Sequence, residues 1–131
     1  MRVLFAWGPV VLQMALIFVA SSTSNPDPLP GRFLDKVLHL AVYAVLGALI
    51  ARALAGGRLV TVTWRHAALA VLLSTLYGIS DEWHQSFVPG RTPDPMDVLA
   101  DLAGASAGSA TIVVLGRKLL TARVSGHARQ R

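Results

Sequence analysis

Cysteine is absent from this 131-residue sequence, and charged residues make up only 15% of it. The lack of cysteine excludes disulfide scaffolds, thiolate catalysis, cysteine-ligated zinc and iron–sulfur clusters. The scarcity of charge, with 53% hydrophobic residues and a mean hydropathy of +0.54, argues against an ordinary soluble domain. The net charge is +5, but the basic residues form no dense stripe interleaved with aromatic residues, so no nucleic-acid partner is expected.

Four apolar stretches organise the chain, at about residues 3–20, 34–55, 64–87 and 95–115. A helix needs about 20 mostly apolar residues to cross a bilayer core of roughly 30 Å. The third stretch is marginal, because its uninterrupted apolar part covers only residues 67–80. The sequence predicts a single all-α domain over residues 1–131, an integral membrane bundle of four transmembrane helices with a basic tail at 118–131.

The first stretch has an alternative interpretation as a cleaved signal peptide. Small residues follow its apolar run at Val19 to Ser22, as a cleavage site requires. A retained helix is favoured for two reasons. Only one basic residue, Arg2, precedes the apolar run, and the run is longer than the apolar region of most signal peptides.

Basic residues predict the orientation, because short loops rich in lysine and arginine stay on the cytoplasmic side. One side would hold Arg2, Arg52, Arg58, Arg65, Arg117, Lys118, Arg123, Arg129 and Arg131. The other side would hold only Arg32, Lys36 and Arg91. Both termini are therefore expected in the cytoplasm, and the loops at 25–36 and 88–94 are expected outside.

All seven acidic residues fall on the predicted outer side, although they played no part in that assignment. They are Asp27, Asp35, Asp81, Glu82, Asp94, Asp97 and Asp101. Acidic residues that merely avoid the basic face would explain Asp27, but several of the others lie inside helices. The pattern predicts a polar binding or catalytic site at the outer ends of the helices.

The second helix carries Asp35, His39 and Tyr43 at intervals of four, which places them on one helix face. An intramembrane histidine can be a polar packing residue bonded to a neighbouring helix. With a carboxylate one turn away, it is equally a candidate for proton transfer or metal ligation.

The fourth helix begins with an acidic pattern. Asp94, Pro95 and Asp97 fit an N-cap, a first-position proline and an acid near the helix dipole. Asp101 lies beyond the first turn, so it must be paired, protonated or in a wet cavity.

The end of the third helix adds further polar side chains. Trp83 and Phe87 suit a lipid interface, and a belt of aromatic residues with solvated acids is one interpretation of this segment. The polar residues exceed what such a belt requires; they are Tyr77, Asp81, Glu82, His84 and Gln85, followed by Arg91 in the next loop.

Small residues indicate how the bundle closes, because they let helices approach closely in lipid. One ridge consists of Ala100, Gly104 and Gly108, and the other of Ala44, Ala48 and Ala51 beside Gly47. Packing of the second helix against the fourth through these ridges would bring His39 near Asp101.

Three segments resemble the VanZ-like membrane protein family. They are DKVLHLAVYAVLG at 35–47, DEWHQSFVPGR at 81–91 and DPMDVLADLAG at 94–104. They match three motifs of the family in the same order and at the same spacing. These motifs are D-K-x-x-H, D/E-x-x-Q followed by F-x-P-x-R, and D-x-x-x-N-x-x-G. Asp101 departs from the pattern, because asparagine is usual there. The first helix lies outside the strongest resemblance.

The resemblance implies a bacterial cytoplasmic membrane protein of the cell envelope, because the founding member is linked to low-level teicoplanin resistance. The expected partner is a membrane lipid, a lipid-linked cell-wall precursor or a glycopeptide. The protein would bind it at the outer side of the membrane. The candidate binding residues are Asp35, Lys36, Gln85, Arg91 and Asp97.

Two other function classes stay open. A membrane-embedded enzyme acting on a lipid-linked phosphate would use His39, Glu82, His84 or Asp101 as acid, base or metal ligand. No H-E-x-x-H or G-x-S-x-G motif is present, so neither a cofactor nor a metal is assigned. Proton-coupled transport is the third class, and four spans make a small transporter unless the protein is a homo-oligomer.

Overall fold

The computed structural model describes residues 1–24 and 32–128, and over this part the chain is all-helical. The helices are α1 (Arg2–Ser21), α2 (Arg32–Leu54), α3 (Trp64–Gln85) and α4 (Pro95–Ala128), with a short 3-10 helix, η1 (Leu59–Thr61), before α3. No strand occurs in these described ranges. The predicted all-α class is confirmed.

The four helices follow the predicted stretches closely except at the end of α4. This helix continues to Ala128 rather than ending near Leu115. The added residues include strong helix formers, among them Arg117, Lys118 and Leu119, and contain no proline. Arg129 and Arg131 of the predicted tail, and the loop residues 25–31 with Asp27, lie outside the described residues.

Three described helices are long and apolar enough to cross a membrane. These are α1, residues Leu34–Leu54 of α2, and residues Pro95–Ser125 of α4. Helix α3, marginal in the sequence, is not among them, because its first turn carries Arg65 and His66 and its last turns carry acidic and amide side chains.

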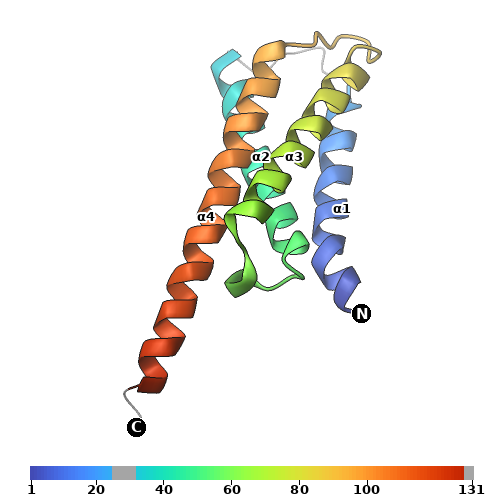
Figure 1. Cartoon of the computed structure of the whole chain (residues 1–131). Coiled ribbons are helices and arrows are strands. Elements are labelled where there is room, and N and C mark those ends of the chain that lie inside the picture. The colour runs from blue at the N-terminus through green and yellow to red at the C-terminus, as the bar shows by residue number, and fades with distance from the viewer. Residues whose placement is uncertain (25–31, 129–131) are drawn as a thin grey trace.

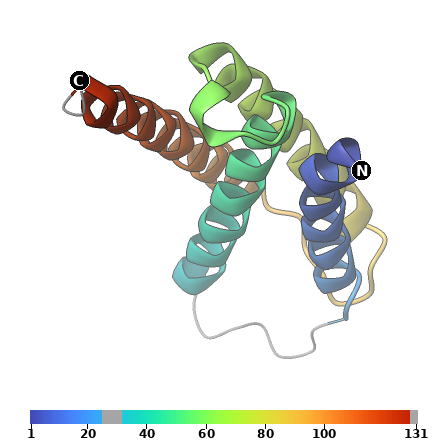
Figure 2. The ribbon, with the colours of Figure 1, turned by 90° about the horizontal axis from the view of Figure 1, so that it is seen from below.

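The bundle is organised around α2 and α4, which lie side by side (Figure 1). Helix α3 packs against both, and α1 packs against α2 and more lightly against α3. Seen from below, α4 slants away from the others, so its C-terminal part extends beyond the bundle (Figure 2). Both termini and η1 lie at one end, and the α3–α4 connection lies at the other (Figure 1).

The close approach of α2 and α4 depends on small residues, as the ridges predicted. A side chain at Gly104 or Gly108 would collide with the backbone carbonyls of Leu40 and Ala44 on α2. A side chain at Gly47 would in turn collide with the backbone of Ala105 on α4. The predicted α2–α4 packing is therefore confirmed, and the two backbones are almost in direct contact.

The exterior of the bundle is apolar and its interior is partly polar. Large hydrophobic side chains are exposed on every α-helix, for example Leu12, Val45, Leu76 and Leu119. Buried positions include Asp81, Glu82, Gln85, Asp97 and Asp101. A soluble domain shows the reverse arrangement, whereas a bundle in lipid exposes apolar side chains and encloses polar ones.

The end of the bundle that holds the termini is basic. A cavity of about 330 Å³ lies there between the start of α1 and the end of α2, and Arg2, Arg52 and Arg58 are among its lining residues. We call this the basic end, and the opposite end, where α3 gives way to α4, the polar end.

Candidate functional site

The start of α4 is built around Asp94, as the N-cap pattern predicted. Its Oδ1 accepts a hydrogen bond from the backbone N–H of Met96 at 2.9 Å, and Pro95 occupies the first helical position. The Asp94 cap satisfies one of the free N–H groups of the helix start, and Pro95 has no backbone N–H to satisfy. The cap fixes where Asp97 and Asp101 project along α4.

Lys36 of α2 lies between two of these carboxylates. Its ammonium is 2.7 Å from Asp94 Oδ2 and also donates to Asp97 Oδ1. This three-residue bridge joins the N-terminal part of α2 to the start of α4. It neutralises the lysine locally, so Lys36 is engaged by protein carboxylates.

One turn deeper, His39 pairs with Asp101. The distance from His39 Nδ1 to Asp101 Oδ1 is 2.9 Å, and Asp101 is 0% exposed. With the Asp101 carboxylate as acceptor, Nδ1 carries a proton, and in the neutral form of the ring Nε2 then carries the lone pair. The pairing that the small-residue ridges predicted is confirmed, and it explains how Asp101 is tolerated inside the bundle.

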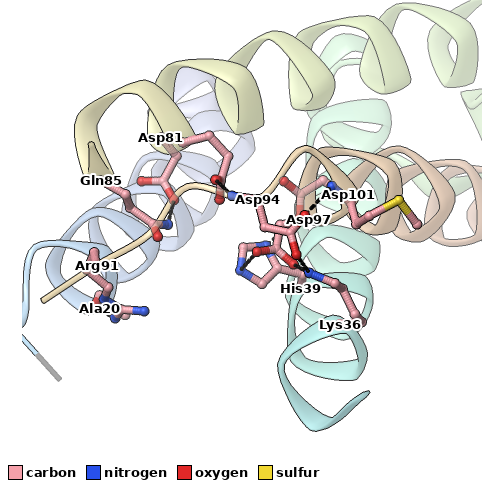
Figure 3. A network of polar contacts seen from close by, with 11 residues as sticks. Ala20, Lys36, His39, Asp81, Gln85, Arg91, Asp94, Asp97 and Asp101 are labelled. Carbon is pink, nitrogen blue, oxygen red and sulfur yellow. Dashed lines mark hydrogen bonds and ion pairs between the residues drawn. The ribbon is translucent and has the colours of Figure 1, made fainter. Parts of the chain in front are cut away.

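We call this group the α2–α4 cluster, and Figure 3 shows Lys36, His39, Asp94, Asp97 and Asp101 of it lying together. It consists of Asp35, Lys36, His39, Asp94, Asp97 and Asp101. Asp35 belongs to it because one carboxylate oxygen lies within 4.8 Å of ligand atoms of His39 and Asp97.

A second polar group joins α1 to α3 beside the first (Figure 3). Ser21 Oγ donates to Asp81 Oδ1 at 2.6 Å, and Gln85 Nε2 donates to Asp81 Oδ2 at 3.1 Å. Both oxygens of this buried carboxylate are therefore satisfied. Ser22 Oγ lies 3.0 Å from His84 Nε2, and the His84 ring stacks on Phe18 at a centroid distance of 4.7 Å.

Arg91 reaches this second group through a tight turn. The Arg91 N–H donates to the carbonyl of Val88 at 3.1 Å, and Gly90 has φ 81, as a type II turn with Pro89 and Gly90 in the middle requires. The guanidinium donates to the backbone carbonyls of Ala20 at 2.9 Å and Thr23 at 3.3 Å. The turn thus ties the α3–α4 connection to the end of α1.

We call this second group the α1–α3 cluster. It consists of Ser21, Ser22, Asp81, His84, Gln85 and Arg91.

Glu82 connects the two clusters. Its Oε2 accepts a hydrogen bond from the backbone N–H of Asp94 at 2.9 Å, which holds the α4 cap against α3. Its Oε1 is buried and has no hydrogen-bond partner among the described residues, as is also true of Asp101 Oδ2. Buried carboxylate oxygens without partners are costly, so these two atoms are candidates for ligand contact or proton transfer.

The structure brings all the sequence-predicted site residues to the polar end but divides them. Asp35, Lys36, His39, Asp97 and Asp101 lie in the α2–α4 cluster; His84, Gln85 and Arg91 lie in the α1–α3 cluster; Glu82 lies between them.

Sequence reasoning missed the contribution of α1. Ser21 and Ser22 were considered only as part of a signal-peptide cleavage site, yet they bond Asp81 and His84. The carbonyl of Met14 further accepts the Tyr77 hydroxyl at 2.7 Å. Paired serines at the end of an apolar run, level with a polar motif elsewhere, were the available signal.

Comparison with protein families identifies the chain. A family model described as VanZ/LLP1 matches residues 4–116. The chain belongs to the VanZ/LLP1 family. The match begins inside α1 and covers all three motifs, so in this VanZ/LLP1 chain α1 is part of the family domain. Searches of curated proteins and of solved structures found no match.

The three motifs that carry the resemblance supply residues of both clusters. The first motif supplies Lys36 and His39, the second supplies Gln85 and Arg91, and the third supplies Asp97 and Asp101. An asparagine at the position of Asp101, as the resemblance makes usual, would present a carbonyl oxygen to His39 Nδ1 in the same way. The departure at Asp101 therefore keeps the hydrogen bond and adds a buried carboxylate.

Proposed function

We propose that this chain is a multi-pass protein of the bacterial cytoplasmic membrane that binds an anionic lipid or lipid-linked cell-wall component at its outer side. Family membership and three helices long and apolar enough to cross a membrane support a membrane protein. The basic end, placed inside by the positive-inside rule, puts both termini in the cytoplasm and the polar end outside. The binding site is then at the level where such lipids present their headgroups.

The state of Arg91 is the observation that carries this proposal. Among the described residues it has no carboxylate partner, and its guanidinium is held by two neutral carbonyls. Carbonyl groups orient a guanidinium without cancelling its charge, and the group has five N–H donors. A fixed, uncompensated arginine with spare donors suits a phosphate or carboxylate.

The two predicted anion contacts differ in this respect. Lys36 is already paired with two carboxylates, so a ligand anion would have to compete with Asp94 and Asp97. Arg91 has no such competitor in the described part of the chain, and Ser22 and His84 lie in the same cluster as further polar contacts. Arg91 is therefore the primary ligand contact in this proposal.

The proposed biological setting is the cell-envelope response to glycopeptides such as teicoplanin. These antibiotics act outside the cytoplasmic membrane on lipid-linked precursors. An outward polar end that holds an anionic group of such a precursor would act where the antibiotic acts.

Binding can be tested with the purified chain in phosphatidylcholine nanodiscs, titrated with a polyprenyl phosphate. Charge-assisted hydrogen bonds contribute about 1.5–3 kcal/mol each, so Arg91→Ala should weaken binding about ten- to a hundredfold. Arg58→Ala removes the same charge at the basic end and should leave the affinity unchanged. Equal affinities for these two variants, or no binding by the parent chain, would refute the proposal.

A second candidate function is enzymatic turnover of a lipid-linked phosphate. Glu82 Oε1 and Asp101 Oδ2 favour it, because both are buried carboxylate oxygens without described partners and either could transfer a proton. Incubation of the nanodisc protein with the polyprenyl phosphate should then release inorganic phosphate, and Glu82→Gln should abolish the release while Ser86→Ala should not. Binding without any release would leave binding as the function.

A further inference from the structure

The α2–α4 cluster places three metal-type ligand atoms together. One oxygen of Asp35, a ring nitrogen of His39 and one oxygen of Asp97 all lie within 4.8 Å of one another. Asp35 and His39 are four residues apart on α2, so they share a face, and Asp97 comes from the first turn of α4. Two helices, locked together by the Lys36 bridge, therefore supply the set.

His39 is oriented as a metal-ligating histidine is. Its Nδ1 lies 2.9 Å from the buried carboxylate of Asp101, and in the neutral ring with its proton on Nδ1 this leaves Nε2, 4.0 Å from Asp97 Oδ2, available as a metal ligand. Histidine ligands usually donate their second ring N–H to a carboxylate or carbonyl, which fixes the tautomer and raises ligand basicity. Asp101 has this positioning role here.

Asp97 is the buried member of the three, whereas Asp35 and His39 are partly exposed. It is only 5% exposed, and its two oxygens are in different situations. Oδ1 accepts from Lys36, whereas Oδ2 has no hydrogen bond among the described residues and faces His39 Nε2 at 4.0 Å. With a neutral imidazole, Nε2 and Oδ2 would both present lone pairs to a cation held between them.

The spacing suits a small divalent ion after a minor closure. Zinc binds nitrogen and oxygen ligands at about 2.0–2.2 Å in tetrahedral geometry, which places ligand atoms roughly 3.3–3.6 Å apart. The 4.0 Å separation of His39 Nε2 and Asp97 Oδ2 is only a few tenths of an ångström wider. Asp35 is only partly buried at the edge of the cluster, so its side chain has room to move inward and complete the ligand set.

The charges point to the same kind of ligand. The cluster contains four carboxylates, those of Asp35, Asp94, Asp97 and Asp101, against one ammonium. Excess negative charge in a partly buried site is unfavourable unless a cation compensates it. A dication at this position would offset most of the excess.

We propose that Asp35, His39 and Asp97 bind one divalent transition-metal ion, with Asp101 positioning the histidine. A set of one imidazole and two carboxylates without sulfur suits zinc or manganese. Three protein ligands leave a coordination position open toward solvent or a bound ligand. The proposal does not depend on lipid binding, because it concerns only residues of the α2–α4 cluster.

Asp35→Asn is the sharpest variant, because Asp35 makes no hydrogen bond or ion pair to another described residue. The protein, free of any affinity tag, is stripped with EDTA, titrated with zinc or manganese, and assayed by elemental analysis after dialysis. We expect one ion per chain in the parent protein. Asp35→Asn and His39→Ala should each weaken binding at least tenfold.

His84→Ala is the matched control, since it removes a histidine from the same end of the bundle but outside the ligand set. It should bind as the parent protein does. A second measurement guards against misfolding: the ion should raise the unfolding temperature of the parent protein and of His84→Ala, but not that of Asp35→Asn. Equal binding by the parent protein and Asp35→Asn, or no stoichiometric binding, would overturn the proposal and identify His39 as an imidazolium between two carboxylates.

Discussion

Gly104 of α4 offers a direct test of the α2–α4 contact that assembles the polar end. A Cβ at this position would lie 2.9 Å from the carbonyl carbon of Leu40 and 3.0 Å from its Cα, and closer still to the carbonyl oxygen. Carbon atoms pack best at about 3.5–4.0 Å, so the two helices would have to separate. The obstructing atoms are backbone, which cannot rotate away.

We expect Gly104→Val to destabilise the bundle by about 1–3 kcal/mol, because overpacking against an unyielding neighbour costs that much. The gain in helix propensity from losing a glycine is below about 1 kcal/mol and only partly offsets this. Gly8→Val in α1 is the matched control, because no atom lies within 4 Å of a Cβ placed there. It should change the stability by no more than about 0.5 kcal/mol.

The assay is reversible unfolding in mixed detergent micelles, followed by loss of helical circular dichroism. The two glycine variants carry the same substitution, so they differ only in what the new side chain meets. If Gly104→Val proves as stable as Gly8→Val, α2 and α4 do not approach as described, and the pairing of His39 with Asp101 loses its basis.

Two further predictions concern buried polar pairs and use the same assay. His39→Leu should destabilise the bundle by about 1–3 kcal/mol, because it leaves the buried Asp101 carboxylate without a partner. Adding Asp101→Leu should recover much of this loss. A loss of stability that the double variant does not reduce would refute this pairing. Ser21→Ala should lower the stability by about 1–3 kcal/mol, because it removes a hydrogen-bond donor from the buried Asp81 carboxylate. Ser22→Ala removes only an exposed hydrogen bond and should change the stability by no more than about 0.5 kcal/mol. Equal effects of the two substitutions would show that the contact of Ser21 with Asp81 does not stabilise the bundle.

Local signals in the sequence predicted much of the fold. The apolar lengths located four helices, and Asp94 followed by Pro95 identified the start of α4 to the residue. The glycine and alanine ridges predicted the α2–α4 packing and, through it, the approach of His39 to Asp101. Each of these signals lies within one helix or one pair of helices.

Contacts between distant segments were not predictable in the same way. The paired serines at the end of α1 mark a polar helix end but do not specify which residue they contact, and Asp81 lies sixty residues later. Arg91 bonds backbone carbonyls, which every residue possesses, so no partner residue type could signal the contact. The end of α4 was placed too early because hydropathy falls after Leu115, although helix propensity does not.

The central claim is that the polar end faces outward and the basic end inward, and thiol labelling tests it most directly. The chain has no cysteine, so single cysteines at Thr92, in the exposed α3–α4 connection, and at Ser125, near the end of α4, report without background. A membrane-impermeant maleimide should label Thr92→Cys on intact cells, and Ser125→Cys only after permeabilisation. Labelling of Ser125→Cys but not Thr92→Cys on intact cells would contradict the account.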